Sequence, residues 1–379
     1  MGLNPSVSAV ESAADRPLEP VVAAASNEAA EAMQGIVVKQ GWTIDLFAAE
    51  PLVANIVAFD IDHQGRVFVC ESFRQNRGVT DNRNHNDEWV LADLSAKTVQ
   101  DRINYHRLLL GEAAGSYAQH DDRIRRLVDT NGDGKADRSD RFASGFHRLE
   151  EGTGAGVLVR GKDVFYTCIP RLWKLTDDDD DGVADQRVAL SDGYGVRVAF
   201  RGHDLHGLVM GPDGRLYFTI GDRGYHVTTG EGKVLANPAV GAVFRCEPDG
   251  SGLEVFSTGL RNPQELAFNE LGDWFTVDNN SDSGDKARVL HLLEEGDYGW
   301  RMYYQYLPTR GPYNEDRLWE PLHREQAAYV VPAIANFTDG PSGLAYYPGT
   351  GFGETLEDQF LVCDFRGSPG VSGVRSFKL

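Results

Sequence analysis

The chain has 379 residues, 41% of them hydrophobic and 10% aromatic, a composition typical of a globular protein rather than a disordered one. Its 42 glycines against 4 methionines indicate many tight turns and few long helices, which favours an all-β fold. The formal net charge of -20 argues against nucleic acid as a partner, because such binding depends on clustered lysine and arginine.

Residues 1–35, rich in Ala, Glu, Ser and Pro, are expected to be disordered or partly helical, with one short helix near Asn27 to Met33. They lack the basic and then apolar pattern of a secretory signal, and no run of about 18 apolar residues follows that would span a membrane. The 4 cysteines form neither a CxxC nor a CxxCH pattern, which excludes a zinc knuckle and a covalent haem site of the usual kind. We interpret them as small buried residues.

From residue 36 to residue 379 one unit recurs, an apolar strand, a tight polar turn and a second apolar strand that ends in polar residues. A second hairpin, built around an acidic turn, follows several copies and starts with RIRRLV, RLWKLT and AVFRC. The copies of the first hairpin lie at residues 56–72, 156–169, 207–222, 265–279 and 343–364.

Two hairpins make a four-stranded unit, and units repeated about every 50 residues indicate a β-propeller, in which each blade buries its faces against its neighbours. A β-sandwich is the alternative, but sandwiches do not usually repeat one two-hairpin unit with the same acidic turn. The fifth unit ends at the strand GVRSFKL. We therefore expect a six-bladed propeller with about five blades present and a truncated C-terminus, so that the domain over 36–379 is incomplete.

The first acidic turn has the spacing of an EF-hand-like calcium loop, with oxygen-bearing side chains at positions 1, 3, 5, 9 and 12 and a glycine at position 6. Position 7 supplies a backbone carbonyl oxygen, and position 12 is an aspartate rather than a bidentate glutamate. A solvated acidic turn is the alternative. The predicted ligands are Asp129, Asn131, Asp133, Lys135 (through its carbonyl), Asp137 and Asp140.

The second acidic turn starts in the same way but has Val188 at position 12, so its coordination sphere needs water or another segment. A solvated turn is again the alternative. We expect any calcium in these loops to be structural, holding the outer part of a blade. The predicted ligands are Asp177, Asp179, Asp181 and Asp185.

Two polar segments precede inner strands of consecutive blades, where loops of a propeller reach the central axis. The first contains His203, a residue type that suits a general base. The second contains Arg261, a fork-shaped donor for an anion, with the amides of Asn262 and Gln264. Such a group suits an anionic planar cofactor. Alternatively, His203, Asp204 and His206 only cap a strand through hydrogen bonds, and Arg261 with Asn262 only fixes the turn before Pro263.

The stretches GHDLHGLVMGPDGRLYFTIGDRG (202–224), GLRNPQELAFNELGDWFTVDNNSDSGD (259–285) and GDYGW (296–300) resemble the soluble quinoprotein glucose and sorbosone dehydrogenase family. With the blade pattern, the resemblance covers residues 36–379. That family consists of six-bladed propellers that carry pyrroloquinoline quinone (PQQ) and calcium and oxidise sugars or related alcohols and aldehydes. The calcium loops and the long first blade with Glu71 are also similar to the propeller of larger bacterial membrane-bound dehydrogenases that carry a cytochrome c domain.

The resemblance implies His203 as the base that takes the substrate hydroxyl proton, and Arg261, Asn262 and Gln264 as PQQ contacts. It also implies Asp222, at the family's acidic position in the motif IGD, as a cofactor contact. It also implies that backbone oxygens near Asn280 and Ser281 bind a calcium beside the cofactor.

We thus expect a PQQ-dependent dehydrogenase domain that acts on a small sugar, alcohol or aldehyde, with Arg261 and calcium polarising the cofactor. The resemblance further implies a periplasmic or cell-surface location, a cytochrome c as electron acceptor, and membrane association only through parts outside this chain. Two other functions fit an acidic propeller. One is a non-enzymatic, calcium-stabilised propeller that binds carbohydrate or a partner protein, and the other is a lactonase or hydrolase with calcium at the axis.

Overall fold

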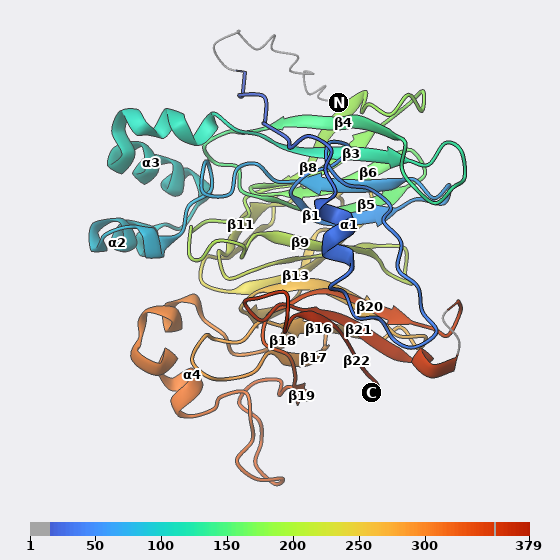
Figure 1. The fold of residues 1–379 in the computed structure, drawn as a ribbon. Coiled ribbons are helices and arrows are strands. Elements are labelled where there is room, and N and C mark those ends of the chain that lie inside the picture. Colours follow the sequence, from blue (N-terminus) through green and yellow to red (C-terminus); the bar gives the residue numbers. More distant parts are fainter. Residues whose placement is uncertain (1–15, 352–353) are drawn as a thin grey trace.

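The computed structural model describes residues 16–351 and 354–379, in which five mostly antiparallel sheets are arranged as the blades of a β-propeller (Figure 1). All five predicted inner hairpins are present, which confirms the repeat. Blade 1 contains β1 (Ile56–Ile61), β2 (Val67–Glu71), β3 (Asp122–Val128) and β4 (Arg138–Phe146). Blade 2 contains β5 (Gly154–Arg160), β6 (Asp163–Cys168), β7 (Arg171–Thr176) and β8 (Gln186–Asp192).

The other three blades follow in chain order. Blade 3 contains β9 (Leu205–Met210), β10 (Leu216–Ile220), β13 (Gly241–Cys246) and β14 (Glu254–Leu260), with β18 (Gly296–Asp297) parallel to β14 and a separate hairpin of β11 (Tyr225–Thr228) and β12 (Val234–Asn237). Blade 4 contains β15 (Pro263–Phe268), β16 (Trp274–Asp278), β17 (Arg288–Leu292) and β19 (Ala335–Asn336). Blade 5 contains β20 (Pro341–Tyr347), β21 (Gln359–Asp364) and β22 (Gly373–Phe377).

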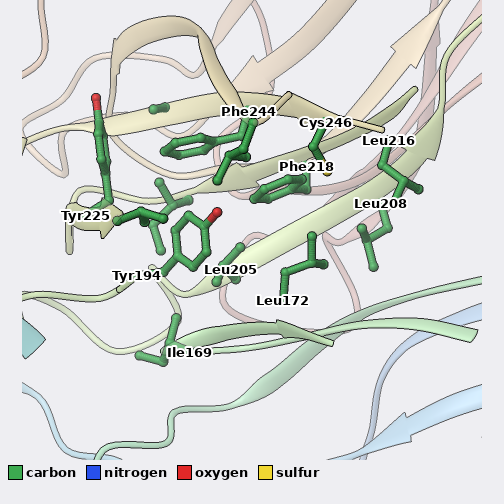
Figure 2. Packing of buried hydrophobic residues seen from close by; sticks show 14 of the residues in the cluster. Ile169, Leu172, Tyr194, Leu205, Leu208, Leu216, Phe218, Tyr225, Phe244 and Cys246 are labelled. Carbon is green, nitrogen blue, oxygen red and sulfur yellow. The ribbon is translucent and has the colours of Figure 1, made fainter. Parts of the chain in front are cut away.

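Each pair of consecutive blades shares its own hydrophobic core, as expected of a propeller. Between blades 2 and 3, Leu172 lies with Leu205, Phe218 and Phe244 in one buried cluster (Figure 2). Separate clusters join blades 1 and 2, blades 3 and 4, and blades 4 and 5. In contrast, β1 leaves Phe59 62% exposed, so this apolar strand is uncovered among the described residues. A sixth blade stays a prediction.

α2 (Asp87–Ser95), α3 (Val99–Leu110) and α4 (Pro312–Glu315) lie to the left of the blades in Figure 1, whereas α1 (Glu28–Met33) overlaps the strands in this view. The two helices between β2 and β3 were not predicted, although Thr98 and Asp101 form a capping box at the start of α3. No helix of residues 16–351 and 354–379 is long and apolar enough to cross a bilayer. The helices are α1 (Glu28–Met33), α2 (Asp87–Ser95), α3 (Val99–Leu110) and α4 (Pro312–Glu315), with 3-10 helices η2 (Asn82–Asn84), η3 (Gly111–Ala118), η4 (Met302–Tyr306), η5 (Pro308–Arg310) and η6 (Glu354–Leu356).

The inner strands of all five blades line an axial cavity of about 330 Å³. Cys363 belongs to this lining and is exposed, so its predicted burial was wrong, whereas Cys70, Cys168 and Cys246 are buried. Glu265 also faces the cavity. Burial raises the pKa of its carboxyl group to about 8, and the negative charge of Asp60 contributes to the rise.

This raised pKa predicts a pH-dependent stability. Between the ordinary value of 4.5 and about 8, the folded protein keeps a proton that the unfolded chain releases, so the contribution of Glu265 to the free energy of unfolding falls as pH rises. We expect Glu265→Gln to remove this loss. The melting temperature of the variant, relative to that of the wild type, should therefore rise as the pH increases from 5 to 9. A difference that stays constant over this range would contradict the assignment.

Candidate active site

His203 and Asp222 are brought together by the inner hairpin of blade 3. His203 precedes β9 and Asp222 follows β10, and the two antiparallel strands pair Leu205 with Ile220 at that end. As a result, His203 Nδ1 lies 2.7 Å from Asp222 Oδ1. His203 is only 5% exposed and Asp222 is fully buried. The predicted base therefore has a carboxylate partner 19 residues away in the chain.

The second oxygen of Asp222 is also occupied. Oδ2 accepts hydrogen bonds from Trp300 Nε1 at 2.7 Å and from Gln305 Nε2 at 2.6 Å. With Oδ1 on the imidazole, the carboxylate favours the tautomer that carries its proton on Nδ1 and leaves Nε2 as the basic nitrogen. Asp222, which the resemblance assigned to cofactor contact, thus lies behind His203 and orients its ring.

The two neighbouring polar residues of the same segment have structural partners. Asp204 and Arg223 are both buried and form an ion pair, and Arg223 also donates to the carbonyl oxygen of Arg197. His206 Nε2 lies 2.9 Å from the carbonyl oxygen of Gly202, and burial lowers the pKa of its imidazole. The capping interpretation therefore suits Asp204 and His206 and leaves His203 as the candidate base.

Arg261 lies on the same side of the propeller as His203. Both contact Phe200, whose ring centroid is 5.9 Å from the His203 ring and 5.9 Å from the Arg261 guanidinium carbon. Arg261 is 1% exposed and donates to Asp282 Oδ2 at 2.7 Å and to the carbonyl oxygen of Asn280 at 2.6 Å. The two segments singled out in the sequence thus meet across Phe200.

The amides predicted beside Arg261 take different places. Asn262 is 3% exposed, and its Oδ1 is buried without a hydrogen-bond partner among the described residues, as is Nε of Arg261. Gln264 lies on β15 and lines the axial cavity together with His206. The structure therefore groups Asn262 with Arg261 and leaves Gln264 at the axis.

Two arginines that were not predicted from the sequence complete this region. The guanidinium carbon of Arg83, in η2, lies 4.4 Å from the centroid of Phe200. Arg310, in η5, donates to the carbonyl oxygens of Ser281 and Gln305. Burial lowers the pKa of Arg310, and the positive charges of Arg261 and Arg83 lower it further. Neither lies in a recognisable motif, because both belong to long connections between strands.

The loop predicted to hold a calcium beside the cofactor is occupied by these arginines. The carbonyl oxygen of Asn280 accepts from Arg261, and that of Ser281 accepts from Arg310 Nε at 2.7 Å. The hydroxyl of Ser281 donates to Asp285 Oδ1 at 2.7 Å. A divalent cation on these carbonyls would lie beside two guanidinium groups, so the arrangement does not fit calcium.

The carboxylates of the first acidic loop bind groups of the loop itself or nearby arginines. Asp129 accepts from the backbone N–H groups of Gly132 and Gly134, and Asp137 accepts from the Thr130 hydroxyl. Asp133 Oδ1 accepts from Lys135 N, and Asn131 Oδ1 from Asp133 N. Asp140 lies on β4 and is paired with Arg126 and Arg138.

The second acidic loop is different, because three of its carboxylates converge. Asp177, Asp179 and Asp185 each place one oxygen within 4.8 Å of the others, an arrangement that the acids of the first loop do not reach in the part of the chain described. Asp181 lies outside this group and accepts from Val183 N at 2.8 Å. The sequence favoured the first loop as a calcium site, whereas in the structure three acids of the second loop converge.

Comparison with known proteins relates the chain to one domain family and to one group of enzymes. The family described as "Domain of unknown function (DUF7133)" matches residues 28–368. Quinoprotein glucose dehydrogenase B of Acinetobacter calcoaceticus is 29% identical over 124 residues, which cover 26% of each chain. The similarity confirms the resemblance to quinoprotein glucose dehydrogenases, but it spans only about a quarter of that relative's length. The likeness to larger haem-carrying dehydrogenases stays a prediction.

Solved structures of sugar dehydrogenases resemble the chain at low sequence identity. The PQQ-bound aldose sugar dehydrogenase of Streptomyces coelicolor is 16% identical with a TM-score of 0.42, covering 86% of this chain and 81% of that one. The apo soluble aldose sugar dehydrogenase of Escherichia coli is 14% identical with a TM-score of 0.44, covering 67% and 79%.

Proposed function

The chain belongs to the DUF7133 family, and we propose that in this member the propeller is a quinoprotein-type dehydrogenase domain that oxidises a sugar or a related alcohol or aldehyde. The observation that carries the proposal is the buried pair of His203 and Asp222, fixed by Trp300 and Gln305. The sequence similarity to a quinoprotein glucose dehydrogenase supports it independently.

In this proposal, His203 and Asp222 carry out the proton transfer of the reaction. His203 Nε2 accepts the proton of the substrate hydroxyl while Asp222 stabilises the positive charge that develops on the ring. Because Asp222 is buried and receives hydrogen bonds from Trp300 and Gln305, it holds the imidazole in one orientation before substrate arrives. The carbon–hydrogen bond of the substrate then breaks as a carbonyl forms, and the two electrons leave with the hydrogen.

The residues around Phe200 fit PQQ, which when bound would supply a quinone that accepts this hydride. Arg261, Arg83 and Arg310 offer guanidinium groups to a planar anion, and Asn262 Oδ1 and Arg261 Nε are buried polar atoms without partners among the described residues. Asp282 holds Arg261 at present, and its 48% exposed side chain can turn away when an anion arrives. We place no calcium on Asn280 and Ser281.

This arrangement predicts opposite effects for two substitutions. Arg310→Gln removes a positive charge and should weaken PQQ binding about 10-fold or more, since a hydrogen bond to a charged group contributes about 1.5–3 kcal/mol. Asp282→Asn removes the competitor of the anion and should strengthen binding severalfold. Arg317→Gln, at a residue whose exposed side chain pairs with Glu320, is the matched control and should bind PQQ as the wild type does.

PQQ titration followed by absorbance, in calcium-free buffer, measures all three affinities. If Arg310→Gln and Asp282→Asn changed the PQQ affinity in the same direction, the assignment of this anion site would be contradicted.

The activity itself is tested by adding PQQ to the chain and following sugar-dependent reduction of a dye, with and without calcium. The absence of both dye reduction and a PQQ absorbance change would reject the dehydrogenase and favour the non-enzymatic, carbohydrate-binding alternative. We further propose a cytochrome c as the electron acceptor and a periplasmic or cell-surface location, as the resemblance implies.

A further inference from the structure

We propose that the loop between β7 and β8 binds one calcium ion through Asp177, Asp179 and Asp185 and that this ion locks blade 2 onto blade 1. This site lies outside the proposed active site and does not depend on the dehydrogenase function. Two ligands that are about 2.4 Å from one ion lie no more than about 4.8 Å apart, and the three carboxylate oxygens meet this limit.

An unpartnered buried oxygen points to the missing ligand. The side chain of Asp177 is 7% exposed, and its Oδ2 accepts from the backbone N–H of Gly182 at 3.0 Å. Its Oδ1 is buried and has no hydrogen-bond partner among the described residues. Because a buried carboxylate oxygen without a donor is unfavourable, a cation among the three acids would satisfy it.

The chemistry of the three acids favours calcium over other metals. The group contains only carboxylate oxygens, which suit hard cations, and no histidine or cysteine that would attract zinc. The loop lacks a carboxylate at position 12, where Val188 is 51% exposed. We therefore expect an affinity in the weaker range of calcium loops, a Kd of about 10⁻⁵–10⁻³ M.

The loop is also the contact between two blades. Arg66, in the turn after β1, binds Asp180 Oδ1 at 2.5 Å, and Arg138 on β4 donates to the carbonyl oxygen of Asp181 at 3.0 Å. The backbone N–H of Ala184 donates to the carbonyl oxygen of Phe142 at 2.9 Å. Blade 1 therefore contacts residues of the loop other than the three converging acids.

Arg126 of β3 places a positive charge beside the proposed ion. Its Nη1 lies 3.5 Å from Asp177 Oδ2, while its Nη2 binds Asp140 at 3.0 Å. Gly182 makes room for it, because a Cβ at this residue, whose φ is +96°, would lie 2.0 Å from Arg126 Nη2. One guanidinium shared with Asp140 offsets only part of the charge of the three carboxylates, so a bound cation would relieve their mutual repulsion.

Calorimetric titration of the EDTA-treated chain with calcium chloride tests the proposal. We expect saturable binding, with the affinity lowered at least 10-fold in Asp179→Asn and in Asp185→Asn, whose side chains lie at the surface. Asp249→Asn, in the exposed turn of blade 3, is the matched control and should bind as the wild type does. Asp133→Asn reports on the first loop and should leave the site at the second loop intact.

Hydrogen exchange then tests the locking role. Calcium should slow exchange in residues 177–188 and in the facing residues 138–143 of blade 1, and this effect should disappear in Asp179→Asn. Binding that survives in both Asp179→Asn and Asp185→Asn, or that is lost only in Asp133→Asn, would overturn the site. Calcium binding without slower exchange in residues 138–143 would overturn the lock between the blades.

Discussion

A His203→Ala variant loaded with PQQ is expected to lose about 10²- to 10⁴-fold in kcat, because it lacks the base that takes the hydroxyl proton. PQQ affinity should hardly change, since His203 binds Asp222 rather than the arginines around Phe200. Stopped-flow dye reduction under saturating sugar measures kcat, and absorbance titration measures cofactor binding. An unchanged kcat would remove His203 from the mechanism.

The controls for this prediction come from the same blade. His226→Gln changes a histidine of β11 whose Nδ1 lies 3.1 Å from the carbonyl oxygen of Lys97, and its kcat should equal that of the wild type. Asp222→Asn tests the positioning role. It should lower kcat with little change in KM and should alter the tautomer of His203, which the nitrogen chemical shifts of the imidazole report. A loss of kcat with an unchanged tautomer would contradict that role.

The propeller could be predicted from the sequence because its information is local. Each inner hairpin carries its own alternation and turn, so the five repeats were found without knowledge of the whole. The insertion between β2 and β3 was missed because it interrupts the repeat. Asn86 and the Thr98–Asp101 capping box mark the starts of α2 and α3 and would have revealed these helices.

The candidate site could be predicted only where its residues sit next to a strand of the repeat. His203, Asp222 and Arg261 do so. Trp300, Gln305 and Arg83 arrive on long connections, and only the folded chain shows that they converge on Asp222 or Phe200. Arg310 likewise reaches the carbonyl oxygens of Ser281 and Gln305 only in the folded chain. The sequence also could not distinguish the two acidic loops, because the spacing of their acids is alike. The contacts of the second loop with blade 1 are visible only in three dimensions.

The second large effect concerns the buried ion pair beneath the Arg261 segment. Asp278 is fully buried and accepts from Arg288 Nη2 at 2.6 Å and from the backbone N–H groups of Arg261 and Asn262. Asp278→Ala leaves the Arg288 charge buried without its partner, which should cost about 3–5 kcal/mol in the free energy of unfolding. Urea unfolding measures this loss. Asp273→Ala, which removes an exposed partner of His291, should cost less than about 0.5 kcal/mol.

A double-mutant cycle separates the lost pair from the lost backbone anchor. Arg288→Met removes the unpaired charge, so Asp278→Ala with Arg288→Met should be more stable than Asp278→Ala alone, with a coupling energy of about 1–3 kcal/mol. The double variant should still bind PQQ weakly, because the N–H groups of Arg261 and Asn262 have lost the carboxylate that fixes them. Additive stability effects would mean that the ion pair does not hold this blade. Restored PQQ binding would mean that Asp278 is not needed to place Arg261.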